Sequence, residues 1–340
     1  MDRPPDSAPW PTTGPSQRAG RETLRRAIEQ HRARALGEIL LERGLGSYRG
    51  YAEVLESIDH RVEDGARLVQ IGHSVCDEPL FAVCFGPSAP TERTRTSVVI
   101  SGLHPLEWIG IETHLALLHR LARLDLGARA VVCIPVANPD GVLRVERNLR
   151  QRRRRWVRHN ARGVDLNRNF DADWGGRGPL GPSVPWRFHA GSHPASEPEV
   201  AAIAFTLGNR RVDRAVSLHS FGAAVLYPSA STLLPIADAA EHREWARFVA
   251  ERGCRHAGAA IPCAWIQAGR SQGGFELDWF HQRHGALSLL VNCPGGNIAQ
   301  RPAKLLEPFA WFNPERPREV TQQLADALVP FLRGDPSPPS

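Results

Sequence analysis

Three apolar runs constrain the fold of this chain more than any other feature. SVVIS at 97–101, AVVCIPV at 130–136 and LSLLV at 287–291 contain almost no polar position. A strand that is apolar on both sides is buried on both faces, as in a central sheet that helices cover. The sequence therefore predicts an α/β domain.

Other runs fit the same plan, because short β-rich segments alternate with helical ones. The expected strands are 67–72, 80–85, 97–101, 130–136, 214–218 and 286–291. The expected helices are 107–123, 197–207, 237–252 and 319–332. A further amphipathic helix is expected at 21–46, where Leu24, Ile28 and Ile39 recur at helical spacing.

Length and composition favour one large domain. The 340 residues are 42% hydrophobic and 23% charged, which is enough to bury a sizeable core. Residues 1–20 are rich in Pro, Ser and Gly and are expected to be a disordered leader. The domain is expected to cover 47–334, with a disordered tail at 335–340.

The N-terminal sequence lacks the basic start and apolar core of a signal peptide, and no apolar run is long enough to span a membrane. We therefore expect a cytoplasmic protein with no membrane partner. Its six cysteines are scattered and are expected to be reduced core residues. The net charge of +6 comes almost entirely from arginine, which makes nucleic acid an unlikely partner, and the sequence does not predict the oligomeric state.

Polar residues that follow apolar strands are candidates for a site, because loops at strand ends carry chemistry in open α/β sheets. His104 and Glu107 lie where a buried strand ends and a helix begins, so one turn can direct both at one point. His219 follows another apolar strand. Two histidines and one glutamate are the ligand set of a catalytic zinc site that leaves a position open for water.

Two further junctions carry polar residues. The basic run at 150–162 continues into VDLNRNF, where Asn167 and Arg168 stand between apolar residues, and an arginine held in this way suits a bidentate contact with a carboxylate. The run itself can also be a solvated loop or a polyanion contact. The last strand ends at Asn292.

Taken together, these stretches resemble the zinc metallocarboxypeptidases of the carboxypeptidase A type. The matching segments, in the family's order, are GLHPLEW, the turn VANPDG, RGVDLNRNF, SEPE, SLHSFG, and GGFELDW through LSLLVN. The resemblance implies a single-domain three-layer α/β/α fold with a mixed sheet of about eight strands. It also implies one Zn²⁺ per chain and a peptide or acyl-amino-acid substrate with a free C-terminal carboxylate.

The resemblance assigns roles to individual residues. It implies that His104, Glu107 and His219 hold the metal and that Asn167 and Arg168 clamp the terminal carboxylate of the substrate. It makes Arg158 the cation that polarises the scissile carbonyl, although the arginines at 152–155 compete for this role. Leu277 lies at the position that lines the pocket for the C-terminal side chain, and it favours apolar termini.

Two departures from the family pattern concern catalysis. The family's general-base glutamate lies fourteen residues after the aspartate of the Asp-Trp pair, and that count from Asp278 reaches Asn292. An amide is not basic near neutral pH. The family also uses a tyrosine before the Gly-rich turn, whereas the three tyrosines here lie upstream of it. Other bases are conceivable among the neighbouring acidic and histidine residues, namely Glu276, His281 and His284.

Three functions remain open at this level. The first is a zinc-dependent carboxypeptidase or related hydrolase, slowed or using a relocated base. The second is an inactive pseudoenzyme that binds C-terminal carboxylates, which Asn292 favours. The third, remote reading is a polyanion-binding protein that uses the run Arg150–Arg162.

Overall fold

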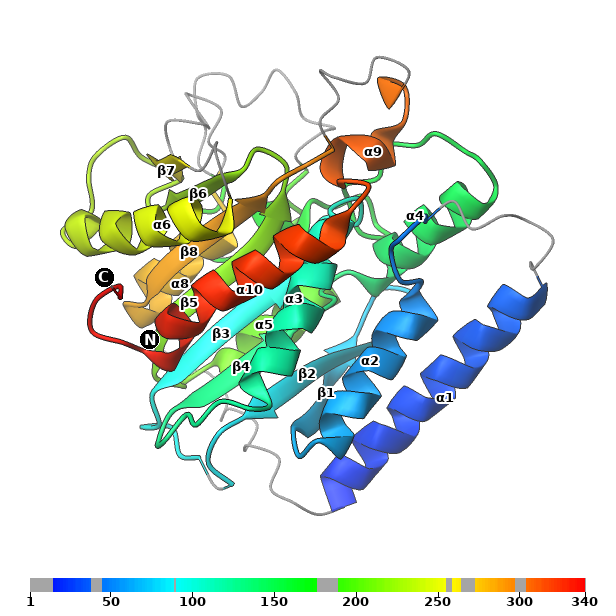
Figure 1. Cartoon of the computed structure of the whole chain (residues 1–340), viewed down its shortest axis with the longest axis horizontal. Coiled ribbons are helices and arrows are strands. Elements are labelled where there is room, and N and C mark those ends of the chain that lie inside the picture. Colours follow the sequence, from blue (N-terminus) through cyan, green and yellow to red (C-terminus); the bar gives the residue numbers. More distant parts are fainter. Residues whose placement is uncertain are drawn as a thin grey trace.

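The computed structural model describes residues 15–37, 45–88, 90–175, 189–254, 259–263, 273–296 and 304–339. A mixed eight-stranded sheet with the order β1-β2-β4-β3-β5-β8-β6-β7 forms the centre of the molecule (Figure 1). The strands are β1 (Arg67–His73), β2 (Pro79–Phe85), β3 (Thr96–Ser101), β4 (Ala130–Ile134), β5 (Val212–Ser220), β6 (Ala224–Tyr227), β7 (Ala259–Pro262) and β8 (Leu287–Cys293). This confirms the expected α/β fold with a mixed sheet.

The middle of the sheet is parallel, and its strands are the apolar runs of the sequence. β3 pairs in parallel with β4 and with β5, and β5 pairs in parallel with β8. All residues of β3 and β4 are buried. The carboxyl ends of β3, β5 and β8 consequently meet at one edge of the sheet.

Helices cover both faces of the sheet. The helices are α1 (Pro15–Gly37), α2 (Tyr51–Glu63), α3 (Trp108–Leu121), α4 (Pro139–Arg150), α5 (Pro198–Leu207), α6 (Ala239–Gly253), α8 (Glu276–His284), α9 (Pro308–Phe312) and α10 (Pro317–Arg333), with a short 3₁₀ turn η1 at Leu166–Arg168. Figure 1 shows α3 and α10 side by side in front of the sheet and α5 and α8 behind it.

Side chains along each central strand alternate between the two faces of the sheet, and each face has its own hydrophobic core. Val99 and Val216 belong to the core that contains Trp108 on α3 and Phe331 on α10. Their neighbours along the strands, such as Val98, belong to the opposite core together with residues of η1, α5 and α8. Successive side chains of a strand point to opposite faces, so each central strand contributes to both layers of packing.

Several element boundaries differ from those expected. α1 begins at Pro15, within the segment expected to be a leader, and ends at Gly37. β4 ends at Ile134, before Pro135, whose ring removes a backbone donor. The NPDG segment, interpreted from sequence as a turn, is the start of α4, because the Asn138 side chain accepts a hydrogen bond from Gly141 N at 3.0 Å.

The cysteines and the apolarity of the helices can be compared with what the sequence predicts. All six cysteines are free and five are buried, whereas Cys76 is exposed. Within the part of the chain that the structure describes, no helix combines the length and apolarity needed to cross a membrane.

Candidate metal centre

One turn of chain after β3 supplies two of the three candidate ligands. Gly102 follows the strand with φ +68°, in the left-handed region that favours glycine, and the chain then turns through His104 to Glu107. Glu107 is the N-cap residue of α3. His219 lies one residue before the end of the adjacent β5, so its side chain meets the loop at the carboxyl edge of the sheet.

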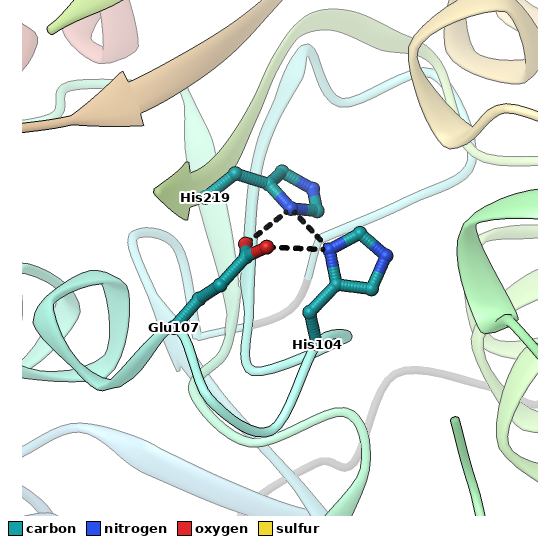
Figure 2. A group of neighbouring side chains, drawn as sticks. All are labelled: His104, Glu107 and His219. Carbon is teal, nitrogen blue, oxygen red and sulfur yellow. Dashed lines mark hydrogen bonds and ion pairs between the residues drawn. The ribbon is translucent and has the colours of Figure 1, made fainter. Parts of the chain in front are cut away.

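The three side chains converge on one point (Figure 2). Glu107 Oε1 lies 2.9 Å from His104 Nδ1, and Glu107 Oε2 lies 2.8 Å from His219 Nδ1. The two Nδ1 atoms are 3.1 Å apart. All three residues are buried, and one ligand atom from each lies within 4.8 Å of the others. The structure therefore brings together the three residues expected to bind the metal.

The opposite nitrogens of both rings contact carboxylates. His104 Nε2 lies 3.0 Å from Asp165 Oδ1, and His219 Nε2 lies 2.8 Å from Glu276 Oε1 and 2.9 Å from Ser217 Oγ. A carboxylate accepts the proton of Nε2–H, which leaves the lone pair on Nδ1 when each ring is neutral, as a metal ligand must be. Both lone pairs then point toward the Glu107 carboxylate, which is the donor arrangement that a divalent cation requires.

The charges around these ligands favour a cation. Burial lowers the pKa of His219, but Glu107 and Glu276 outweigh it and raise this pKa to about 10. Burial raises the pKa of Glu107, and the neighbouring His104 and His219 outweigh it, so that this pKa lies below its usual value. The carboxylates thus stabilise a positive charge at the ligand cluster, which a metal ion can supply.

Arg158 lies next to this cluster and not among the exposed arginines. Its Nε donates to Asp165 Oδ2 at 2.7 Å, so that Asp165 bridges Arg158 and His104. Burial raises the pKa of Asp165, but Arg158, His104 and Arg168 hold it well below its usual range. The competing arginines at 152–155 are exposed. Arg158 is therefore connected to the candidate ligands through Asp165.

Asn167 and Arg168 are both buried in η1. The Arg168 guanidinium lies 3.8 Å from the ring centroid of Phe275, and its Nη1 donates to the carbonyl of Asn167 at 2.5 Å. Burial lowers the pKa of Arg168 to about 10, although Asp165 and Glu276 oppose this shift, so the side chain remains cationic at neutral pH. Asn167 Oδ1 accepts a hydrogen bond from Glu276 N at 3.3 Å, which ties η1 to α8.

The remaining expected residues lie on β8 and α8. Asn292 pairs in register with His219 on the neighbouring parallel strand and is half-buried. Leu277 is buried in a small apolar cluster with Phe275, Leu226 and Leu290. The stretch 264–272, where the family tyrosine was sought, lies outside the described residues.

Comparison with known proteins agrees with this geometry. The family model described as zinc carboxypeptidase matches residues 51–308. The chain belongs to the zinc carboxypeptidase family.

Individual relatives of this chain are distant. Carboxypeptidase A2 of Mus musculus is 27% identical over 229 residues, which cover 61% of this chain and 54% of the relative. Inactive metallocarboxypeptidase ecm14 of Talaromyces stipitatus is 26% identical over 270 residues, covering 66% of this chain and 45% of the relative. The match thus spans about half the length of these relatives.

Solved structures show the same fold. The carboxypeptidase A of Helicoverpa armigera superposes with a TM-score of 0.64 at 22% identity, covering 84% of this chain and 75% of that chain.

Sequence reasoning missed two carboxylates. Asp165 and Glu276 are buried and contact the Nε2 atoms of the two histidines. Asp165 lies in the VDLNRNF segment, two residues before Asn167, and its place in that segment is the sequence signal that could have identified it. Glu276 was considered as a base, but it lies on the Nε2 side of His219 and not on the Nδ1 side.

The other two candidate bases lie elsewhere. His281 Nε2 is 3.1 Å from Asp238 Oδ1, and the ring of His284 packs 5.0 Å from that of Trp279. Of the three candidate bases, Glu276 is the one that contacts a candidate ligand within the described part of the chain.

A second group of potential ligands, Asp238, His242 and His281, is better explained as structural. Ser288 N donates to His242 Nε2 at 3.1 Å, so this nitrogen is unprotonated and the ring proton resides on Nδ1. That proton points to the carbonyl of Asp238, which lies 3.2 Å away. His242 therefore has no lone pair to share with the other two side chains.

Proposed function

We propose that this chain is a zinc-dependent hydrolase that releases C-terminal residues from peptides or related amides. The observation that carries the proposal is the convergence of His104 Nδ1, His219 Nδ1 and the Glu107 carboxylate, with both Nε2 atoms contacting carboxylates. This is a three-ligand set with its rings already oriented. Family membership supports zinc as the metal.

Each neighbouring residue then has a function that its position supports. A zinc ion held by His104, Glu107 and His219 would supply Lewis acidity and would acidify water at the site. Arg158, adjacent to the ligands through Asp165, stabilises negative charge that develops on the scissile carbonyl oxygen. Arg168 pairs with the free carboxylate of the substrate, since it is buried, cationic and held by Phe275.

Asn292 sets the expected rate. It pairs with His219 where a base would be required, and its amide cannot accept the proton of the attacking water and pass it to the leaving amine. General acid–base catalysis contributes typically about 10²- to 10⁴-fold. We therefore propose a slow hydrolase.

A second candidate is a pseudoenzyme that binds C-terminal carboxylates without cleaving them. Two observations favour it: Asn292 itself, and the similarity to a metallocarboxypeptidase whose name describes it as inactive. Arg168 would have the same function in both cases.

The two candidates are separated by quantifying zinc and then incubating the protein with a peptide library and with N-acylated amino acids. Release of C-terminal residues, abolished by chelation, supports the hydrolase. Binding of free-acid peptides without any release supports the pseudoenzyme. Equal binding of free-acid and amidated peptides by the wild type would contradict both candidate functions, because Arg168 would then not bind the terminal carboxylate.

A further inference from the structure

A basic cavity of about 610 Å³ lies between the end of α4 and α9. Its cationic lining consists of the arginines at 152–155 together with Lys304, and its acidic lining consists of Glu307 and Glu315. We call this cavity the arginine groove. The surplus of positive charge marks it as a surface for anions.

The acidic residues of the groove do not neutralise it. Glu315 forms an ion pair with Lys304, and Glu307 lies 4.0 Å from Arg154. Arg153 and Arg155 are exposed and have no acidic partner among the described residues. Two guanidinium groups are thus available to bidentate acceptors such as carboxylates.

The groove adjoins the metal centre. Leu106, which lines it, lies in the ligand loop between His104 and Glu107. Asn313, also on the lining, donates from Nδ2 to the carbonyl of Leu106 at 2.8 Å and accepts from Ile109 N at 2.8 Å. The wall between the groove and the ligands is therefore held by direct hydrogen bonds to the loop that carries them.

An aromatic shelf extends along the same side. It consists of Trp156, Phe221, Trp311 and Phe312, whose ring centroids are 5.4 to 6.0 Å apart in the contacting pairs. Trp156 is 60% exposed and Phe221 is 47% exposed. Phe221 comes two residues after His219, and Trp156 directly follows Arg155, so the shelf connects the metal centre with the arginine groove.

We infer that the arginine groove is a subsite for acidic residues that precede the cleaved bond, so that the substrates are acidic peptides. The inference rests on the proposed function, which places the terminal carboxylate at Arg168. Arg168 stacks over Phe275 at the start of α8, whereas the groove is built by the end of α4, the segment after it and α9. A peptide whose C-terminus lies at Arg168 therefore extends over the shelf toward Arg155 and Arg153.

The test measures binding by fluorescence anisotropy, which requires no cleavage. The zinc-loaded protein is titrated with a fluorescein-labelled Glu-Glu-Gly-Phe peptide and with its Gln-Gln-Gly-Phe counterpart. We expect the acidic peptide to bind about tenfold more tightly, since two partly exposed ion pairs contribute at most a few-fold each. This preference decreases as salt rises, because screening weakens exposed charge pairs.

The matched variants are Arg153→Gln/Arg155→Gln and the control Arg26→Gln/Arg93→Gln, which removes two exposed arginines far from the groove in sequence. The first variant is expected to lose the preference and the control to keep it. Retention of the preference in Arg153→Gln/Arg155→Gln overturns the subsite. A single-stranded oligonucleotide of equal charge provides a second test. The subsite is also overturned if the wild type binds this oligonucleotide more tightly than the acidic peptide and the variant Arg153→Gln/Arg155→Gln does not. Absence of cleavage of both peptides would contradict the hydrolase, while the binding result would still decide the subsite.

Discussion

In the hydrolase that we propose, Asn292 is the residue at which the site differs most from a complete hydrolytic centre. It pairs with His219 in register, and paired residues of neighbouring strands direct their side chains to the same face of a sheet. The metal ligands and Arg168 are buried, and Arg158 is half-buried. Under the proposed function, the missing component is a proton acceptor at one position.

Replacing Asn292 by glutamate should restore that component. We expect Asn292→Glu to increase the rate of C-terminal release by about 10² or more, the lower range of general acid–base catalysis. Zinc content should not change. The control is Asn292→Gln, which has the same length without a basic group and should stay slow. A zinc-loaded, peptide-binding Asn292→Glu that remains inert would show that the defect lies elsewhere.

Glu276 contacts the candidate metal centre through His219. It is fully buried, its Oε1 lies 2.8 Å from His219 Nε2, and its Oε2 has no hydrogen-bond partner among the described residues. A carboxylate at this nitrogen fixes the tautomer and orientation of the ring and increases its basicity as a ligand. Because Glu276 contacts Nε2 of His219 and not the candidate ligand atom Nδ1, its role in the proposed site is to position the His219 ring.

Removing this carboxylate should weaken metal binding. We expect Glu276→Ala to decrease zinc affinity about 10- to 100-fold, the usual cost of losing such a partner. Glu276→Gln should lose less zinc affinity, since its amide oxygen can still accept a hydrogen bond from the Nε2–H group of His219. Competition with a chromogenic chelator measures the affinity, and unfolding of the zinc-free proteins controls for damage to the fold. Unchanged affinity in Glu276→Ala would exclude this role.

At the scale of elements, the metal centre depends on how closely α3 approaches β5. Glu107 lies at the start of α3, and His219 lies near the end of β5. Gly110 in the first turn of α3 makes this approach possible, because a Cβ there would lie 2.9 Å from the carbonyl oxygen of Leu218. A backbone atom cannot move aside as the end of a side chain can.

Gly110→Ala should therefore separate the two elements. Alanine favours a helix by about 1 kcal/mol over glycine, but overpacking against a backbone costs roughly 1–3 kcal/mol. We expect a net loss of stability together with weaker zinc binding, measured by thermal unfolding and chelator competition. Gly20→Ala on α1 is the control, since its nearest contacts would be at 3.6 Å and 3.7 Å, and it should be neutral or stabilising. If Gly110→Ala binds zinc as tightly as the wild type, the metal centre does not depend on the close approach of α3 to β5.

At the scale of the whole molecule, the features that could be predicted from the sequence are those that depend on the pattern of neighbouring residues. The central strands were predictable because a strand buried on both faces is apolar at nearly every position. The helix α4 was missed because its polar sequence begins with Asn-Pro-Asp-Gly, which is also typical of a turn. The contacts of Asp165 and Glu276 join segments distant in the chain, so no spacing rule reveals them.

The same long-range assembly predicts that metal binding stabilises the entire fold. The ligand atoms come from the β3–α3 loop and from β5, and their Nε2 partners are the N-cap residue of η1 and the first residue of α8, so that an ion at the ligands would link four segments around the sheet. A ligand at about a thousandfold excess over its Kd stabilises the native state by about 4 kcal/mol.

Chelation of zinc should consequently lower the unfolding temperature by about 5–10 °C. Re-addition of zinc should reverse the shift. His219→Ala should unfold at the same temperature with or without the chelator, because it lacks one of the three ligands. Asn292→Glu, whose ligands are intact, should respond as the wild type does. A wild type that contains stoichiometric zinc and yet shows no shift on its removal would mean that the metal does not link these segments.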